Sequence, residues 1–484
     1  MNNRASVTIY TYTRFWLSFL SLHDLCRMHD RKASVSTQIS IVGANITGLA
    51  AACVMQRSGH KVVVLEKGDG NFKSSGVVAS PPNMTRVLKR WGLGPYLEKC
   101  ASPVDQFHFL EGSTGTTIGV LKLYEELMED LMAEFMLIRH GDLLSIFQDM
   151  ARREGVEIRY NTPVVKLQRV PVACILEDGE YLYSDFIIGA DGSSRSIARD
   201  AVLLRQIEEY SIQHMSFTVS VPFTGMQSDP ELRDMCEQTD WNLWLGEEFV
   251  IYGASVRSQR TYSLCITSKV DEHSSEFRGN WTKAYPIDHF NLHVERFEPR
   301  IQKLLKLAGS FIPTSSITTP EPENLICDLD KVILMGQSAH PTPPDGMHAT
   351  AMCIEDVDAL DYLFTRIKNV SEIPRILSAH EELRMERCTH ARDWESRKLQ
   401  MLTLRPGPER AIRDAKLHAL SESPDLEEKE GAFNDIWGEE VDFWNFDSIT
   451  DADNWYSMYG SAIARQTTAG SNALGLEISA LTLD

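Results

Sequence analysis

A glycine-punctuated stretch near the N-terminus constrains the fold more than any other feature. Gln38–Val42 is a short apolar run, and Gly43–Gly48 is a predicted turn. Leu49–Arg57 has the small, apolar composition of a helix that packs closely on a sheet, and a second apolar run, Lys61–Leu65, follows it. A strand, a helix and a strand in this order predict a βαβ unit and hence a parallel sheet.

The turn carries part of a dinucleotide-binding fingerprint. Gly43 permits a tight turn, and Gly48 lets the helix approach the strand. Glu66 ends the second strand, where an acidic residue holds a ribose hydroxyl. Asn45 stands at the middle glycine position, so its side chain could intrude on a pyrophosphate, although Asn tolerates left-handed backbone angles. The alternative is an ordinary βαβ turn without a ligand; the strand–turn–helix–strand context and Glu66 favour dinucleotide binding.

The stretch Lys331–Leu360 predicts a second ligand loop. Val332–Met335 is an apolar run typical of a buried strand, and Gly336 ends it. A polar loop containing Pro341, Pro343 and Pro344 follows, and a helical pattern begins near Ala349. A strand that leads through a loop to a helix N-terminus is a site for an anionic or electron-rich ligand.

The remaining pattern divides the chain into regions. Helices are predicted at Met84–Trp91 and Asp142–Arg153, and strands at Val156–Tyr160, Val164–Leu167 and Tyr181–Ile188. Alternating runs predict antiparallel strands at Met215–Val221, Trp241–Leu245, Phe249–Val256 and Thr261–Thr267. Trp281–Gly309 has helical spacing, and the chain beyond Ile373 is helical and highly charged.

Composition excludes several classes of function. The net charge of −20 over 484 residues argues against non-specific binding to nucleic acid or to an anionic membrane. The nine cysteines form no CxxC pair and no metal-ligand spacing, which fits a reducing compartment and predicts no metal. Phe15–Leu22 is apolar but too short to span a bilayer, so no membrane span is expected. We therefore expect a cytoplasmic protein with a poorly ordered extension at residues 1–37; no feature indicates an oligomeric state.

Three segments resemble the motifs of one enzyme family. Val78–Leu93 resembles the proline–asparagine segment of FAD-dependent aromatic hydroxylases, Asp185–Arg195 resembles their ADG motif, and Lys331–Leu360 resembles their GD motif. They occur in the family's order and spacing. The tail, with Trp444–Asp447 and Asp451–Trp455, is similar to the end of the fungal salicylate hydroxylase-like group. The chain thus resembles a class A FAD-dependent monooxygenase over residues 38–460.

The resemblance implies an α/β fold with a FAD-binding, Rossmann-like domain of the glutathione-reductase type. An antiparallel-sheet substrate domain and a helical C-terminal region complete it. The predicted division is an extension at 1–37, the FAD-binding domain at 38–205 and 321–372, the substrate domain at 206–320, and the helical region and tail at 373–484.

The resemblance also implies FAD as the cofactor and NAD(P)H as a transient co-substrate. The expected cofactor-binding residues are Gly43, Glu66, Val77, Arg139, Asp191, Gly192, Gln337, Ala349 and Thr350. Arg139 precedes Gly141–Leu143, where the family places an arginine before a helix, but His140 is only one position away. An arginine at a helix N-terminus is poorly placed without an anion nearby, which favours a role for Arg139.

Four departures from the family pattern gather at the expected flavin site. Asn45 replaces glycine, and Gln337 replaces aspartate. Ser75–Val78 reads SGVV where the family shows GAGI, and His348–Ala349 replaces Gln–Gly. Gln337 can still bond a ribityl hydroxyl but without charge. His348 either stabilises a reduced flavin as an imidazolium or simply fills the loop, and both readings stay open.

The resemblance implies hydroxylation of a small aromatic, phenolic or polyketide-like substrate with NAD(P)H and O2, in fungal secondary metabolism. The alternative is a diverged flavin-fold protein with weakened FAD binding that no longer hydroxylates. We expect the substrate between the second sheet and the flavin, with Trp241, Trp244 and Tyr252 as candidate walls, although strand aromatics more often belong to the core. The sequence identifies no catalytic base.

Overall fold

The computed structural model describes residues 32–71, 76–193, 196–203, 212–269, 283–290, 292–317, 322–327, 331–342, 346–422 and 426–460. Most of the expected N-terminal extension and the polar tail beyond residue 460 therefore lie outside the described residues, as do Ser75, Pro343 and Pro344.

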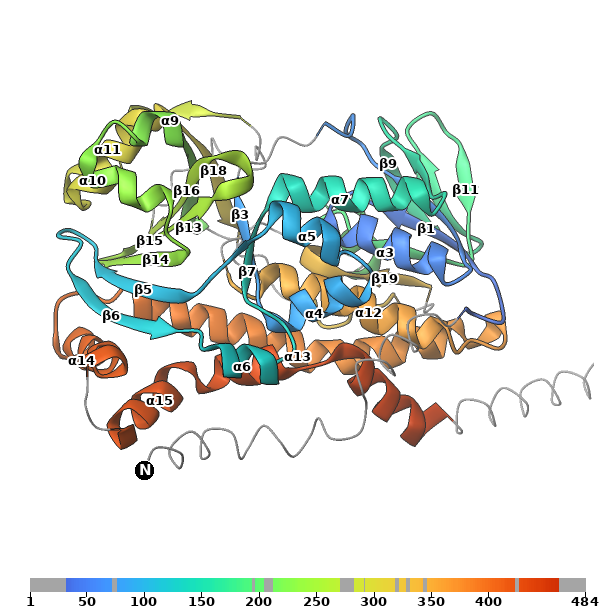
Figure 1. The fold of residues 1–484 in the computed structure, drawn as a ribbon. Helices are drawn as coiled ribbons and strands as arrows, with labels where there is room; N and C mark the ends of the chain where they lie inside the picture. The colour runs from blue at the N-terminus through green and yellow to red at the C-terminus, as the bar shows by residue number, and fades with distance from the viewer. Residues whose placement is uncertain are drawn as a thin grey trace, which may run out of the picture.

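A five-stranded parallel sheet forms the first part of the molecule, as the βαβ pattern predicts. Its strand order is β19 (Val332–Leu334), β12 (Phe186–Gly189), β1 (Gln38–Val42), β2 (Lys61–Leu65), β8 (Glu157–Arg159). Helix α3 (Ile46–Arg57) packs against both α7 (His140–Arg153) and α12 (Ala349–Phe364), as Figure 1 shows. The central strands are nearly continuous apolar runs because helices cover the sheet.

The predicted strand Tyr181–Ile188 is wrong as a single element. It divides into β11 (Tyr181–Tyr183) and β12, which belong to different sheets. β11 completes an antiparallel meander with β9 (Val164–Arg169) and β10 (Val172–Leu176). Asp185 marks the change, because its carboxylate accepts a bond of 2.7 Å from the backbone N–H of Gln38 at the start of β1.

An eight-stranded sheet forms the second part. Its order is β17 (Tyr285–Pro286), β18 (Ser310–Ile317), β13 (Ile212–Pro222), β16 (Thr261–Lys269), β15 (Phe249–Val256), β14 (Asp240–Gly246), β5 (Gln106–Glu111), β6 (Thr117–Lys122). The four strands predicted between residues 215 and 267 are all present. Neighbouring strands are antiparallel except for the β14–β5 pair, which is parallel. β5 and β6 come from residues 106–122, and the domain boundaries stay a prediction.

The helical pattern predicted for Trp281–Gly309 is largely wrong. Between residues 283 and 309 the structure has β17, two short 3-10 turns and a single α-helix, α11 (Pro299–Ala308). Pro286 interrupts the pattern because proline lacks a backbone donor, whereas Pro299 is tolerated in the first turn of α11. The apolar residues Leu292, Phe297 and Ile301 join the core of the eight-stranded sheet.

The C-terminal region is helical, as predicted. It contains α13 (Ile373–Leu402), α14 (Pro408–Glu422) and α15 (Leu426–Asn445), and residues 448–460 are also helical. α13 packs against α12 and β15 and therefore connects the two sheets, while α14 packs on β6 and α15 on α4 (Pro82–Arg90) (Figure 1). Among the described residues, no helix combines the length and apolarity needed to cross a membrane.

The structure also contains another small antiparallel sheet and several short helices. A small antiparallel sheet contains β3 (Val77–Ser80), β7 (Met136–Arg139) and β4 (Ser102–Pro103). The short helices are α5 (Gly94–Cys100), α6 (Glu125–Asp130), α8 (Ile197–Leu203), α9 (Phe223–Met226) and α10 (Pro230–Arg233).

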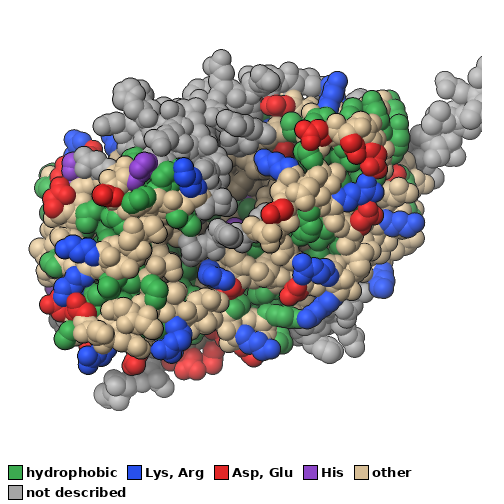
Figure 2. Space-filling view, turned by 90° about the horizontal axis from the view of Figure 1, so that it is seen from above, with side chains coloured by type: hydrophobic (Ala, Val, Ile, Leu, Met, Phe, Trp, Pro, Cys, Tyr) green, Lys and Arg blue, Asp and Glu red, His purple; other side chains and the backbone are tan. Residues whose placement is uncertain are grey.

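Seen from above, acidic and basic side chains are interspersed over the surface, and that face is hollowed between the two halves of the molecule (Figure 2).

A buried carboxyl group gives the fold a testable pH dependence. Asp361 lies in α12 with 3% of its surface exposed. Burial raises the pKa of Asp361 from 3.8 to about 8, and the nearby Asp358 carboxylate adds to the rise. The folded protein therefore holds a proton at neutral pH that the unfolded chain releases.

We expect Asp361→Asn to flatten the pH dependence of stability. Between the unfolded and folded pKa values the native state binds the extra proton, so the free energy of unfolding falls as pH rises from about 4 to about 8. The neutral amide does not titrate, so the variant should gain stability over the wild type towards pH 8. Urea unfolding at several pH values measures this, with the exposed Asp149→Asn as control. Parallel pH curves for Asp361→Asn and wild type would contradict the assignment.

Candidate functional site

The site lies at the carboxyl ends of the central parallel strands. β1 is flanked by β2 on one side and β12 on the other, so the chain leaves β1 at the point where the strand order reverses. Crevices at such switch points bind ligands in open α/β sheets. Gly43 follows β1, Glu66 follows β2 and Asp191 lies just beyond β12. Three residues predicted from two separate motifs therefore meet at one edge of the sheet.

Two glycines allow the loop after β1 to pack closely against neighbouring backbone. Gly43 has a φ of +104°, and a Cβ atom there would lie 2.4 Å from the carbonyl oxygen of Ala190. A Cβ atom on Gly48 would lie 1.9 Å from the carbonyl oxygen of Gly43. Neither position can hold a larger residue without moving backbone. The loop thus has the close packing of β1, β12 and α3 that a dinucleotide cradle requires.

Asn45 caps helix α3 and does not adopt the left-handed conformation considered from the sequence. Its φ is −82° and its ψ −173°, an extended conformation usual for an N-cap. The side-chain oxygen accepts a bond of 3.0 Å from the backbone N–H of Gly48, and the amide nitrogen donates to the carbonyl of Ala190 at 2.6 Å. The Asn45 side chain is therefore held at both ends, by Gly48 and by Ala190.

Glu66 joins the loops that follow β1 and β2. One carboxylate oxygen accepts from the backbone N–H of Ala44 at 2.8 Å, and the other accepts from the backbone N–H of Gly68 at 2.7 Å. The residue is 9% exposed. Each carboxylate oxygen has a second lone pair, so a ribose hydroxyl can still be bound.

Val77 and Arg139 lie opposite each other on the antiparallel strands β3 and β7. The guanidinium of Arg139 donates to the Asp142 carboxylate at 2.6 Å through Nη2 and at 3.1 Å through Nε, and the side chain is one-third exposed. Burial lowers the pKa of the neighbouring His140. Of the two adjacent basic residues Arg139 and His140, Arg139 is thus the cation. Its guanidinium has further donors for an anion at the start of α7.

Asp191 and Gly192 connect the loop after β12 to the loop after β19. Asp191 accepts from the hydroxyl of Ser196 at 2.5 Å and from the backbone N–H of Ala198 at 3.2 Å. The backbone N–H of Gly192 donates to the hydroxyl of Ser338 at 2.9 Å. Burial raises the pKa of the Asp191 carboxyl, although these bonds oppose the rise.

Gln337 bonds within its own loop. Its side-chain oxygen accepts from the backbone N–H of Thr342 at 3.2 Å, and its amide nitrogen donates to the Thr342 hydroxyl at 3.0 Å. The glutamine therefore bridges the start and the later part of the loop after β19.

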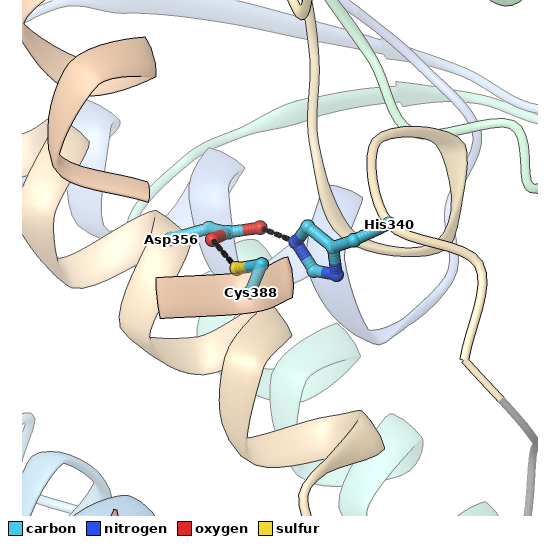
Figure 3. Close-up of side chains that lie close together, drawn as sticks. All are labelled: His340, Asp356 and Cys388. Carbon is cyan, nitrogen blue, oxygen red and sulfur yellow. Dashed lines mark hydrogen bonds and ion pairs between the residues drawn. The ribbon is translucent and has the colours of Figure 1, made fainter. Parts of the chain in front are cut away.

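Asp356 anchors that loop, a role that the sequence pattern did not reveal. The carboxylate accepts from the backbone N–H of Gly336 at 3.0 Å and lies 2.5 Å from Nε2 of His340. On its other oxygen it accepts from Nε of Arg384 at 2.8 Å, and Cys388 lies beside it at 3.7 Å. Figure 3 shows how His340, Asp356 and Cys388 converge from the loop, α12 and α13.

The His340, Asp356 and Cys388 side chains have the donor types of a transition-metal site, and the three ligand atoms lie within 4.8 Å of one another. Both oxygens of Asp356 already accept protein hydrogen bonds. Burial disfavours a charged His340, but Asp356 and Cys388 outweigh it and hold the pKa of His340 well above its ordinary value. Two cations, His340 and Arg384, therefore surround one carboxylate, and we assign the group to anchoring the loop.

His348 faces the C-terminal helices. Its Nε2 lies 2.7 Å from the carboxylate of Glu440 on α15, and both side chains are fully buried. Its ring packs against Phe443, with the centroids 4.6 Å apart. These contacts attach the start of α12 to α15. Both readings left open by the sequence stay predictions.

Two adjoining cavities lie against the eight-stranded sheet. The first has about 520 Å³ of space between atoms, part of it open to solvent, and is lined by Val77, Thr350 and Gly346 on one side and by residues of β14, β15 and β16 on the other; we call it the inner cavity. The second has about 470 Å³ of such space and lies between the sheet and helices α13, α14 and α15, with Phe109, Met347 and Trp437 among its lining residues; we call it the aromatic cavity. Trp241 and Tyr252 line both cavities.

Trp244 is not part of this wall. It lies three residues after Trp241, so it faces the opposite side of β14, where it donates to Glu298 in the second core. Ala349 is buried at the first position of α12, next to Thr350. The sequence-predicted residues thus fall into two groups: Gly43, Glu66, Asp191 and Gly192 at the sheet edge, and Val77 and Thr350 in the lining of the inner cavity.

Comparison with known proteins assigns this architecture. The family model of the FAD binding domain matches residues 36–304, more than half of the chain. The FAD-dependent monooxygenase atnJ of Arthrinium sp is 23% identical over 416 residues, which cover 86% of this chain and 94% of that protein. The 3-hydroxybenzoate 6-hydroxylase 1 of Aquipseudomonas alcaligenes is 24% identical over 67% of this chain and 79% of its own length.

A solved structure shares the fold. A salicylate hydroxylase determined as a substrate complex superposes with a TM-score of 0.68 at 16% identity, covering 87% of this chain and 98% of the other. The sequence predicted an α/β FAD-binding fold with a second, antiparallel sheet and a helical C-terminal region, and this fold is confirmed; the second sheet has one parallel pair, β14–β5.

We expect Asn45→Ala to destabilise the folded protein by about 1–2 kcal/mol, because the helix loses its N-cap and the Ala190 carbonyl loses a donor. Asn45→Asp can still cap α3 but cannot donate to Ala190, so it separates the two contributions. Urea unfolding of the protein without added ligand measures both. Wild-type stability in Asn45→Ala would show that the side chain is not held as described.

Proposed function

Since the chain belongs to the FAD-binding-domain family of flavin-dependent monooxygenases, we propose that it uses NAD(P)H and O2 to hydroxylate a small aromatic, phenolic or polyketide-like molecule. The observation that carries this proposal is the inner cavity, which lies between the start of α12 and an aromatic-bearing sheet face. A planar ring can bind there beside the expected cofactor.

FAD fits the residues that surround the sheet edge. Gly43 and Gly48 allow the tight strand-to-helix turn that brings the N-terminus of α3 to the sheet edge, where a pyrophosphate would bind, and Glu66 is placed for a ribose hydroxyl. Arg139 offers remaining donors, and the Asp191–Gly192 turn lies next to the loop that carries Gln337. When bound, FAD supplies the redox chemistry that links NAD(P)H and O2 to the substrate.

The chain's own contribution is to orient the substrate and keep it dry. Trp241 and Tyr252 form a wall shared by the two cavities, and Val77 and Thr350 face them across the inner cavity. A ring held between these walls would displace water from the inner cavity, while Ser263 and Thr350 offer hydroxyl groups to it. A hydroxyl-bearing ring that enters from the aromatic cavity would reach the region of Thr350 at the start of α12.

The relatives support the reaction class. The names of atnJ and 3-hydroxybenzoate 6-hydroxylase 1 both describe oxygen insertion by a monooxygenase or hydroxylase. We infer a role in secondary metabolism and a cytoplasmic location for this chain. The alternative of a flavin-fold protein that no longer hydroxylates is not favoured, because hydrogen bonds to Ala190 and Thr342 hold Asn45 and Gln337 in place and the tight turn at Gly43 is kept.

Absorbance and oxygen consumption test the proposal together. Purified protein, incubated with FAD and desalted, should retain flavin absorbance. NADPH or NADH should bleach it more quickly in the presence of a productive phenol from a ring panel, with matching O2 uptake and a hydroxylated product by mass spectrometry. A protein that retains no flavin after incubation would refute the proposal.

Gln337→Asp should tighten FAD binding by roughly tenfold if residue 337 meets the ribityl chain, because a carboxylate makes a stronger, charge-assisted hydrogen bond. Gln337→Asn is the matched control, since it has the same length as aspartate without its charge. Fluorescence titration of flavin-free protein with FAD gives the dissociation constants. Equal affinities for the aspartate and asparagine variants would place residue 337 outside the cofactor contact.

A further inference from the structure

We propose that the aromatic cavity selects an uncharged ring and rejects a ring carboxylate, because the cation in its wall is already neutralised. The inference rests on the proposed function and narrows its substrate class. Among the described residues that line the two cavities, Lys398 is the one with a charged side chain.

Lys398 is held by two carboxylates. Its Nζ donates to Glu440 at 2.6 Å and to Glu395 at 3.1 Å, and the side chain is 8% exposed. Burial disfavours the charged ammonium, but the two carboxylates outweigh burial and raise the pKa of Lys398 above its ordinary value. The side chain is therefore a bound cation whose charge is already neutralised by its partners.

The two carboxylates are themselves fixed. Glu440 is also bonded to Nε2 of His348 at 2.7 Å and accepts from the indole N–H of Trp394 at 3.0 Å. Glu395 accepts from the backbone N–H of His348 at 2.9 Å. Neither carboxylate can swing away to release Lys398 without leaving a buried donor unpaired.

A ring carboxylate would therefore meet an unfavourable environment. It would lose its hydration in a cavity lined by Phe109, Trp241, Tyr252 and Trp437, and it would lie near Glu395 and Glu440 with no free cation. An uncharged ring loses little hydration and gains apolar contact. The relatives named for salicylate and 3-hydroxybenzoate take ring acids, so this chain differs from them in the charge of its substrate.

A matched ligand pair tests the selectivity directly. At pH 7.5 the ring of 2-naphthol is neutral, whereas 2-naphthoate is an anion of similar shape. Isothermal titration calorimetry of the purified, flavin-containing protein should show at least about tenfold tighter binding of 2-naphthol, the lower limit expected for an unpaired buried charge. Equal or tighter binding of 2-naphthoate, or no binding of either ligand, would overturn the inference.

Glu440→Gln should shift this preference. The amide keeps the shape of the side chain and removes one negative charge beside Lys398, so 2-naphthoate affinity should rise about tenfold with no comparable change for 2-naphthol. Glu395→Gln is a second variant with the same expectation, in case the first does not fold. Glu439→Gln is the control, because Glu439 directly precedes Glu440 in the sequence but pairs with Arg397 at the surface.

Adding Lys398→Met to the Glu440→Gln protein should abolish the gain, since no cation then remains for the carboxylate. An unchanged 2-naphthoate affinity in folded Glu440→Gln and Glu395→Gln proteins would contradict the role of the two carboxylates. Flavin absorbance and NAD(P)H-dependent O2 uptake are read in the same samples. Their loss would refute the proposed reaction, whereas the calorimetric preference reports on the cavity by itself.

Discussion

Two neighbouring buried carboxylates on α12 hold the site together. Asp356 fixes the loop after β19 through Gly336 and His340 and fixes α13 through Arg384. Glu355 accepts from the side-chain amide of Asn83 on α4 at 2.7 Å and bonds Arg387 on α13. Burying a carboxylate destabilises a fold unless the group is paired. These two carboxylates have partners in the loop after β19, in α4 and in α13. They position α12 relative to the loop, α4 and α13, and the start of α12 in turn borders the inner cavity.

Local sequence signals predicted the parallel sheet but not the changes between sheets. The βαβ unit at Gln38–Leu65 could be predicted because glycine turns and apolar runs are local properties. The division of Tyr181–Ile188 depends on Asp185 meeting Gln38, which is far away in sequence. The orientation of His348 depends on Glu440, 92 positions later, so no local pattern could have shown it. Trp244 is different: strand alternation from Trp241 already indicated the opposite face.

The departures from the family pattern are internally satisfied substitutions. Asn45 uses both ends of its amide on the α3 cap and on Ala190, and Gln337 uses both ends on Thr342. Replacement of a conserved charge or glycine usually leaves a polar group without a partner, at a cost of about 1–3 kcal/mol. Here Asn45 bonds Gly48 locally and Ala190 in the loop after β12, and Gln337 bonds Thr342 within its own loop. The loops can therefore keep their backbone shape, which is what a cofactor bound largely through backbone groups requires.

One ionic network joins the start of α12, next to the inner cavity, to the wall of the aromatic cavity. His348 contributes its backbone N–H to Glu395 and its ring to Glu440, while Lys398 contacts both carboxylates from the wall of the aromatic cavity. Any change of charge in that wall must therefore act on the first residues of α12, next to Thr350 and the inner cavity. The charge of that wall and the position of the helix start are thus linked through Glu395 and Glu440, so the residue at position 348 has a structural role in the wall of the aromatic cavity as well as at the start of α12.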